Sequence, residues 1–281
     1  MLARQTALVS ENMTITFSEL GRVSAALQRQ AVRDLGPIWE VQATVDAFQK
    51  LEDVPLGYWP IIVMDEINTP GAAGVHEDKD GQPFALVQAR PGWSLTASHE
   101  CLEMLVDPFG NRLVPGLSPK PGQGRVEFLV EVCDPSEAAA FAYTVNGVTV
   151  SDFYTPHYFD PVVNPAVPYS FTAAIKKPRD VLKGGYLSWH DLKSDHWFQE
   201  TFFDGTKPKF RDLGKLSAKA GQNIRSQIYG LTPEAFAHRQ LSGSALTAAR
   251  ASVEIVSTAA SSKAEAWRRQ IASLTRRSSR R

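Results

Sequence analysis

The chain has 281 residues, 30 basic and 30 acidic side chains, and 43% hydrophobic residues. This length and apolar content exclude a disordered chain and allow one large domain or two small ones. No apolar run approaches the roughly 20 residues of a membrane span, and the start lacks the apolar segment of a signal peptide. The two cysteines, Cys101 and Cys133, predict reduced thiols and a cytoplasmic protein, and export without a conventional signal stays open.

The net charge of zero conceals an uneven distribution. Residues 263–281 hold seven basic side chains and one acidic side chain, whereas the other 262 residues hold 23 basic and 29 acidic ones. We therefore expect a mildly acidic body with a basic end. The arginines of this end suit contact with nucleic acid or an acidic partner, and a solubilising end is the alternative.

The first predicted element is a helix that begins at a capping-box pattern, Thr16 and Glu19. Apolar residues then recur at helical spacing, and Gly36-Pro37 is expected to stop the helix. Residues 39–48 alternate apolar and polar side chains, which is typical of a half-buried strand.

Further strands are expected in the next part of the chain. Residues 58–66 are nearly all apolar and predict a central strand. Residues 67–83 are rich in glycine and read as a loop, and the pair His76 and Glu77 is best explained there by solvation. Residues 84–89 predict another strand.

A helix is predicted for residues 93–108, with Ser94 or Thr96 as its N-cap and Pro108 at its end. The remaining elements follow in chain order. They are a turn-rich loop at 109–123, a strand at 125–135, a hairpin around Asn146-Gly147, a proline-rich stretch at 154–168, strands at 184–191 and 196–205, and helical sequence from 214 onward.

The helix contains the segment "TASHECLEMLVDP", residues 96–108, which carries the most specific chemical signal. Residues four apart lie on one helix face about 6 Å apart, so His99 and Glu103 can bind one metal ion together. Glu100 is rotated by about 100° from His99, where a general base for a metal-activated water belongs. Imidazole and carboxylate are both competent zinc ligands.

A third protein ligand must come from outside this helix. Asp107 lies about 12 Å along the axis from His99, so we expect it to act as an outer partner or a helix-end group. Glu131, on the strand that follows, is the first choice as ligand, with Asp134 as its alternative or as an outer partner. Asp152 and His157 are the next candidates.

Other groups of polar residues carry weaker signals. His157 and Tyr158 are candidate catalytic residues that could steady an oxyanion, together with Tyr154, although packing explains aromatic residues equally well. Cys101 is expected to be a small core side chain. A second metal cluster is less expected at a hairpin turn that contains His190, Asp191, Asp195 and His196.

The order of two strands, a loop, an edge strand at 84–89 and a His-Glu helix resembles the zincin metallopeptidases. In those enzymes an edge strand binds extended peptide, and the helix carries the metal and the base. More narrowly, "SHECLEMLVDPFGN", "LQRQAVRDLGPIWEV", "VEVCDP" and "VSDFYTPHYFDP" are similar to a group of bacterial and phage zincin-like proteins with Glu in place of the second His. The resemblance covers residues 16–190 and implies metal at His99 and Glu103, with Glu100 as the base.

These observations predict an α+β protein in two parts. Residues 1–213 are expected to form a zincin-like metal-binding domain, and residues 214–281 a helical, arginine-rich extension. The predicted function is peptide hydrolysis with one zinc ion per chain, in which Glu100 takes up a proton from water. Two alternatives stay open, an inactive zincin scaffold that binds partners through its basic end, and a hydrolase of substrates other than peptides.

Overall fold

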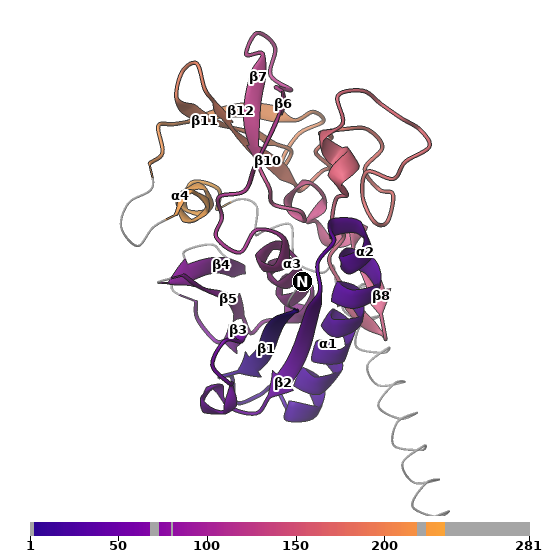
Figure 1. Cartoon of the computed structure of the whole chain (residues 1–281), viewed down its shortest axis with the longest axis vertical. Coiled ribbons are helices and arrows are strands. Elements are labelled where there is room, and N and C mark those ends of the chain that lie inside the picture. The colour runs from indigo at the N-terminus through magenta and orange to yellow at the C-terminus, as the bar shows by residue number, and fades with distance from the viewer. Residues whose placement is uncertain (1–2, 68–72, 80, 218–222, 234–281) are drawn as a thin grey trace, which may run out of the picture.

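The computed structural model describes residues 3–67, 73–79, 81–217 and 223–233. Two five-stranded sheets and a short hairpin accompany a few helices, which confirms the predicted α+β class. Figure 1 shows the first sheet in the lower half of the view and the second sheet in the upper half. None of the described helices is both long and apolar enough to cross a membrane. The basic end at 263–281 lies outside the described residues.

The first sheet has the strand order β2-β1-β3-β5-β4. Strands β2, β1, β3 and β5 run parallel, and β4 is an antiparallel strand at the edge. The bounds are β1 (Arg4–Ser10), β2 (Ala43–Phe48), β3 (Trp59–Met64), β4 (Gly74–Lys79) and β5 (Gln82–Gln88). The strands predicted at 39–48, 58–66 and 84–89 are thereby confirmed, with β3 at the centre.

The loop prediction for residues 67–83 is wrong in its second half. Residues 74–79 form β4, which pairs with β5 from Gly74 opposite Val87 to Lys79 opposite Gln82. Strand β5 is therefore paired on both sides, and β4 takes the edge position that the family resemblance gave to residues 84–89. A strand pair joined by two residues of the Asp-Gly type is a strong hairpin pattern, so the sequence did contain this signal.

The N-terminal helix covers one face of this sheet. Helix α1 (Phe17–Arg29) begins as predicted, because the Thr16 hydroxyl accepts a hydrogen bond from the Glu19 N–H. The expected stop at Gly36-Pro37 is wrong. The helical path continues through a π-helical turn, residues 30–35, into α2 (Gly36–Trp39), which has Pro37 in its first turn.

The second sheet is antiparallel, with the order β12-β11-β10-β7-β6. Its strands are β6 (Leu113–Leu117), β7 (Arg125–Leu129), β10 (Tyr186–Asp191), β11 (His196–Thr201) and β12 (Lys209–Gly214). The predicted hairpins are confirmed, both β10–β11 and the separate pair β8 (Tyr143–Val145) and β9 (Val148–Val150) around Asn146-Gly147. Residues 109–123 were predicted to be a loop, and this is wrong for the part that forms β6.

The two sheets are joined by the last described helix, α4 (Ile224–Gly230). Tyr229 of α4 packs with Val75 of the edge strand β4, and Ile228 packs with Trp197 of β11. Figure 1 shows α4 beside the gap between β4 and the second sheet, close to helix α3 (Trp93–Val106). This helix therefore covers the place where β4, α3 and the second sheet meet.

Gly74 permits the close approach of β4 to α3. A Cβ atom at Gly74 would overlap the Thr96 side chain and lie 2.8 Å from Glu100 Oε1. We expect Gly74→Ala to lower the free energy of unfolding by about 1–3 kcal/mol through overpacking. Urea denaturation measures this, with Gly21→Ala on α1 as the control, because a Cβ there meets nothing within 4 Å. A neutral Gly74→Ala would contradict the close approach.

Glu200 of β11 gives the fold a pH dependence. Glu200 and Asp180 line one cavity of about 610 Å³. Burial first, and then the Asp180 carboxylate, raises the pKa of Glu200 from 4.5 to about 7. Between these values the folded protein retains a proton that the unfolded chain has released, so the free energy of unfolding falls as the pH rises.

Glu200→Gln removes this titration. We expect the variant to have a higher Tm than the wild type at about pH 8, and a much smaller difference at about pH 4. Thermal unfolding at both pH values is the measurement, with Glu127→Gln on β7 as the matched change. An equal shift of Tm at both pH values would contradict the assignment.

Candidate metal centre

Helix α3 carries the central side chains of the site and is buried along almost its whole length. It begins after Gly92, whose φ of 85° turns the chain, and no side chain caps it. The N-cap predictions for Ser94 and Thr96 are thus wrong, and the Ser94 hydroxyl instead donates to the Thr149 carbonyl of β9. Since α3 lies between the sheets, its polar residues must find partners inside the protein.

A first set of ligand atoms gathers around His99. Its Nε2 lies 3.1 Å from Glu103 Oε2 and 3.3 Å from Asp134 Oδ1. Two donors about 2.0–2.2 Å from one zinc ion at a tetrahedral angle are about 3.3–3.6 Å apart, so both separations are close to that spacing. Glu103 is held in place by its other oxygen, which accepts a hydrogen bond from the Cys133 N–H at 3.1 Å.

Asp134 reaches His99 because the chain turns sharply after β7. The strand ends at Leu129, and Asp134 begins a 3-10 turn that ends at Ser136. Gly185 packs against the carbonyl oxygens of this turn, where a Cβ would lie 2.6 Å from the Asp134 oxygen. Glu137 follows the turn and also offers an oxygen to the set formed with His99 and Asp134.

Glu131, the first choice as third ligand, lies beyond the end of β7 rather than on it. Its Oε1 accepts a hydrogen bond from Arg225 Nε at 2.8 Å and forms an ion pair with Arg225 Nη2 at 2.7 Å. Its Oε2 accepts from the Tyr229 hydroxyl at 3.3 Å. Burial raises the pKa of Glu131, and the Arg225 charge opposes this rise. The residue remains within 4.8 Å of ligand atoms of Glu103 and Asp134.

A second set of ligand atoms forms around His76, which lies on β4 and is fully buried. Its Nδ1 is 3.2 Å from Glu100 Oε2 and 3.7 Å from Glu103 Oε2. The expectation that His76 is a solvated loop residue is therefore wrong. Its neighbour Glu77 is only partly buried and is therefore closer to the solvated residue that was expected. Glu77 also accepts a hydrogen bond from the Ser226 hydroxyl of α4.

Helix α4 closes the site with two side chains. The Tyr229 hydroxyl, whose one proton is shared between Glu131 and Glu103, lies 3.5 Å from Glu103 Oε2, and the buried Arg225 guanidinium is 3.3 Å from the Asp107 carboxylate. Asp107 also accepts hydrogen bonds from the Asn111 and Arg112 N–H groups, which places it at the helix end, as one of its two predicted roles required.

Tyr154 supplies an unusual buried hydroxyl. It packs against Tyr158 with ring centroids 4.4 Å apart. Among the described residues no hydrogen-bond partner is found for the Tyr154 hydroxyl. Burial, followed by Tyr158 and the carboxylates of Glu131, Glu103 and Asp134, raises the pKa of Tyr154. A buried hydroxyl beside these carboxylates is expected to have a hydrogen-bond partner, and water or an ion in the centre would supply one.

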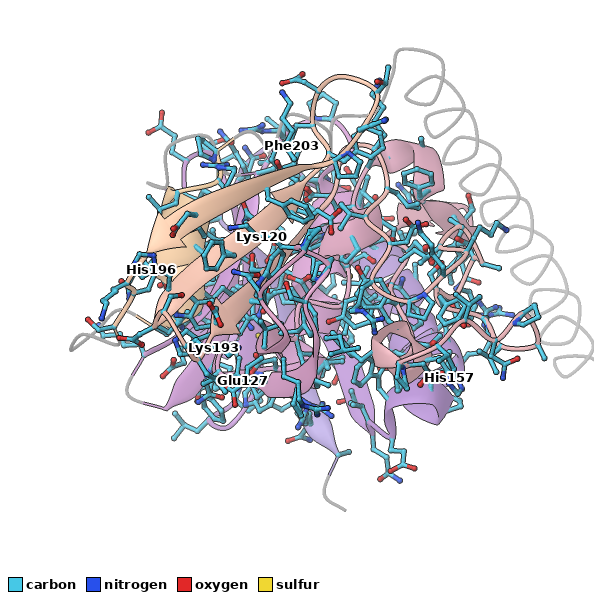
Figure 2. The ribbon with its side chains drawn as sticks, turned by 90° about the horizontal axis from the view of Figure 1, so that it is seen from above. Lys120, Glu127, His157, Lys193, His196 and Phe203 are labelled. Carbon is cyan, nitrogen blue, oxygen red and sulfur yellow. The ribbon has the colours of Figure 1, made fainter. Side chains whose placement is uncertain are left out.

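The other two aromatic-loop candidates point elsewhere. His157 is exposed and pairs with Asp160 at 2.9 Å, and Figure 2 shows it at the rim of the molecule. Tyr158 is buried, and its hydroxyl donates to the Asp180 carbonyl at 3.2 Å. Asp152, a further candidate for the third metal ligand, is buried, and its carboxylate accepts a hydrogen bond from the Thr172 N–H.

The hairpin cluster divides between two partners. His190 pairs with Asp195 at 3.1 Å, whereas His196 pairs with Asp212 on β12 at 3.0 Å. His196 lies on the outer side of the second sheet in Figure 2. Asp191 holds its own turn by accepting from the Ser194 hydroxyl. These contacts account for the hairpin residues without a metal.

Both cysteines are buried, and neither is in a disulfide. Burial raises the pKa of the Cys101 thiol to about 12, as expected for a core side chain rather than a nucleophile. Cys133 lies closer to the site, because its sulfur can join His99 and Glu103 in a third possible ligand set. Its sulfur is 3.8 Å from the His99 carbonyl oxygen.

The buried groups of this centre could hold a metal ion. The structure brings the predicted residues His99, Glu100 and Glu103 into one buried cluster with Asp134, which the sequence analysis placed behind Glu131. The cluster also contains four residues that the sequence did not indicate: His76, Glu137, Arg225 and Tyr229. Comparisons of the chain with protein families, with curated proteins and with solved structures each found no match.

Proposed function

We propose that the chain is a zinc-dependent hydrolase of the zincin type that cleaves peptide bonds. The observation that supports this most strongly is the placement of His99 Nε2, 3.1 Å from Glu103 Oε2 and 3.3 Å from Asp134 Oδ1, in a buried position. We infer that these three side chains are the protein ligands. The antiparallel edge strand β4 beside α3 supports the family resemblance, since such a strand can pair with extended peptide.

A zinc ion in this position would lower the pKa of a coordinated water to about 7. Glu100 is the group that takes the proton, because it follows His99 on the helix and is not among its ligand set. His76 holds Glu100 Oε2 at 3.2 Å and so fixes the carboxylate. Glu100 then passes the proton to the leaving amine, as general bases do in the second half of such reactions.

The burial of the site favours a second candidate, a metal-stabilised scaffold without activity. His99, Glu100 and Glu103 are at most 1% exposed, and Tyr229 of α4 contacts Glu103. In the hydrolase proposal, α4 is therefore expected to move aside for a peptide to reach Glu100. In the scaffold proposal α4 stays closed, and the metal stabilises the fold.

One experiment separates the two proposals. The full-length chain and a His99→Ala/Glu103→Ala variant are analysed for bound zinc and assayed on an unstructured peptide library, before and after a chelator. Chelator-sensitive cleavage that zinc restores, absent from the variant, supports the hydrolase. Bound zinc without cleavage supports the scaffold, and a wild type without zinc after incubation with the ion contradicts both. His157→Ala is the matched control, because His157 lies outside the cluster.

A further inference from the structure

The two histidines of the centre belong to different ligand sets. His99 groups with Asp134 and Glu137 and, separately, with Glu103 and Cys133, whereas His76 groups with Glu100 and Glu103. Among the described residues no set of atoms within 4.8 Å of one another contains both histidines. Two ligands of one tetrahedral zinc ion are only about 3.3–3.6 Å apart. A single such ion therefore does not account for both imidazoles.

Glu103 is the residue common to the two sets. Its Oε2 lies 3.1 Å from His99 Nε2 and 3.7 Å from His76 Nδ1. Carboxylate bridges of this kind hold metal pairs in two-metal hydrolases, where the ions are about 3.5–4 Å apart. The separation of 3.2 Å between His76 Nδ1 and Glu100 Oε2 is also close to the spacing of two ligands on one ion.

We propose that the protein binds two divalent metal ions, one at His99 and Glu103 and the other at His76, Glu100 and Glu103. The second site extends the proposed function, because it shares Glu103 with the first. The nitrogen and carboxylate donors suit Zn²⁺ and Mn²⁺. In a two-ion form, Glu100 Oε2, which lies 3.2 Å from His76 Nδ1, would be the ligand atom, and Oε1 would be the oxygen left to take a proton.

In the one-ion form used for the proposed function, His76 and Glu100 share a hydrogen bond instead. The one-ion and two-ion forms differ in metal content. Full-length protein is loaded with Zn²⁺ or Mn²⁺, freed of excess ion, and analysed for metal per chain. We expect two equivalents in the wild type and one in His76→Leu, which keeps the volume of the side chain. His190→Ala is the control, because His190 pairs with Asp195 on the second sheet.

Electron paramagnetic resonance of the Mn²⁺ form gives an independent reading. Two ions that share Glu103 are expected to give a spin-coupled spectrum, and His76→Leu is expected to give the spectrum of an isolated ion. If His76→Leu does not fold by circular dichroism, His76→Gln replaces it. One equivalent in the wild type, unchanged in the His76 variant but lost in His99→Ala, overturns the second site and leaves the proposed function standing. No bound ion in the wild type overturns both.

Discussion

Glu100→Gln is expected to lower kcat/KM for peptide cleavage by about 100- to 10,000-fold, the usual contribution of a positioned general base. The amide is close in size to the carboxylate but cannot take the proton. Because Glu100 is buried against β4 and is not in the His99 set, the ion at His99 is expected to stay bound. The measurement is steady-state kinetics on the best peptide from the library, together with zinc analysis.

Glu127→Gln provides the matched control for this prediction. The substitution Glu127→Gln makes the same change from carboxylate to amide on β7. Figure 2 shows Glu127 near the surface of the second sheet. Its variant is expected to keep wild-type kinetics. A Glu100→Gln variant with unchanged kcat/KM would falsify the role of Glu100 as the base.

Arg225→Ala is expected to destabilise the protein by about 3–5 kcal/mol, because it leaves buried acids without their cation. Arg225 is 0% exposed and contacts both Glu131 and Asp107. It also donates to the Asp107 carbonyl at 2.9 Å, so α4 loses its main polar anchor in the variant. Urea denaturation of the wild type and the variant measures the difference.

The comparison for this change is an ion pair at the surface. Lys177 is 3.5 Å from Asp180, and the Lys177 side chain is mostly exposed. Lys177→Ala is expected to change the free energy of unfolding by less than about 1 kcal/mol. If Arg225→Ala costs no more than Lys177→Ala, the buried ion pair does not anchor α4.

The parts of the site that lie close together in sequence were the ones that could be predicted. Helical spacing alone places His99, Glu100 and Glu103 together, because their geometry depends only on the local backbone. The hairpin at Asn146-Gly147 was predictable for the same reason, since its turn is encoded by two adjacent residues.

The remaining parts depend on contacts that no local pattern encodes. Asp134 reaches His99 through a turn packed on Gly185, and Arg225 reaches Glu131 from 94 positions away. Strand β1 has only three fully buried apolar residues in a row, Ala7 to Val9, and is therefore a weak strand signal on its own. The position of His76 was not predicted for a different reason. The glycines that precede it favoured a loop, although the Asp-Gly pair that follows it is typical of a hairpin turn.

The position of α4 has a consequence for the kinetics of metal exchange. All the side chains of the two ligand sets precede α4 in the chain, so they can be assembled before the helix that covers them is in place. Once Arg225 contacts Glu131 and Tyr229 contacts Glu103, an ion held by Glu103 is expected to leave through opening of α4. Local opening of this kind has its own free energy, which is lower than or equal to that of global unfolding. The residence time of the ion is therefore expected to report the opening of α4 rather than the strength of the metal–ligand bonds.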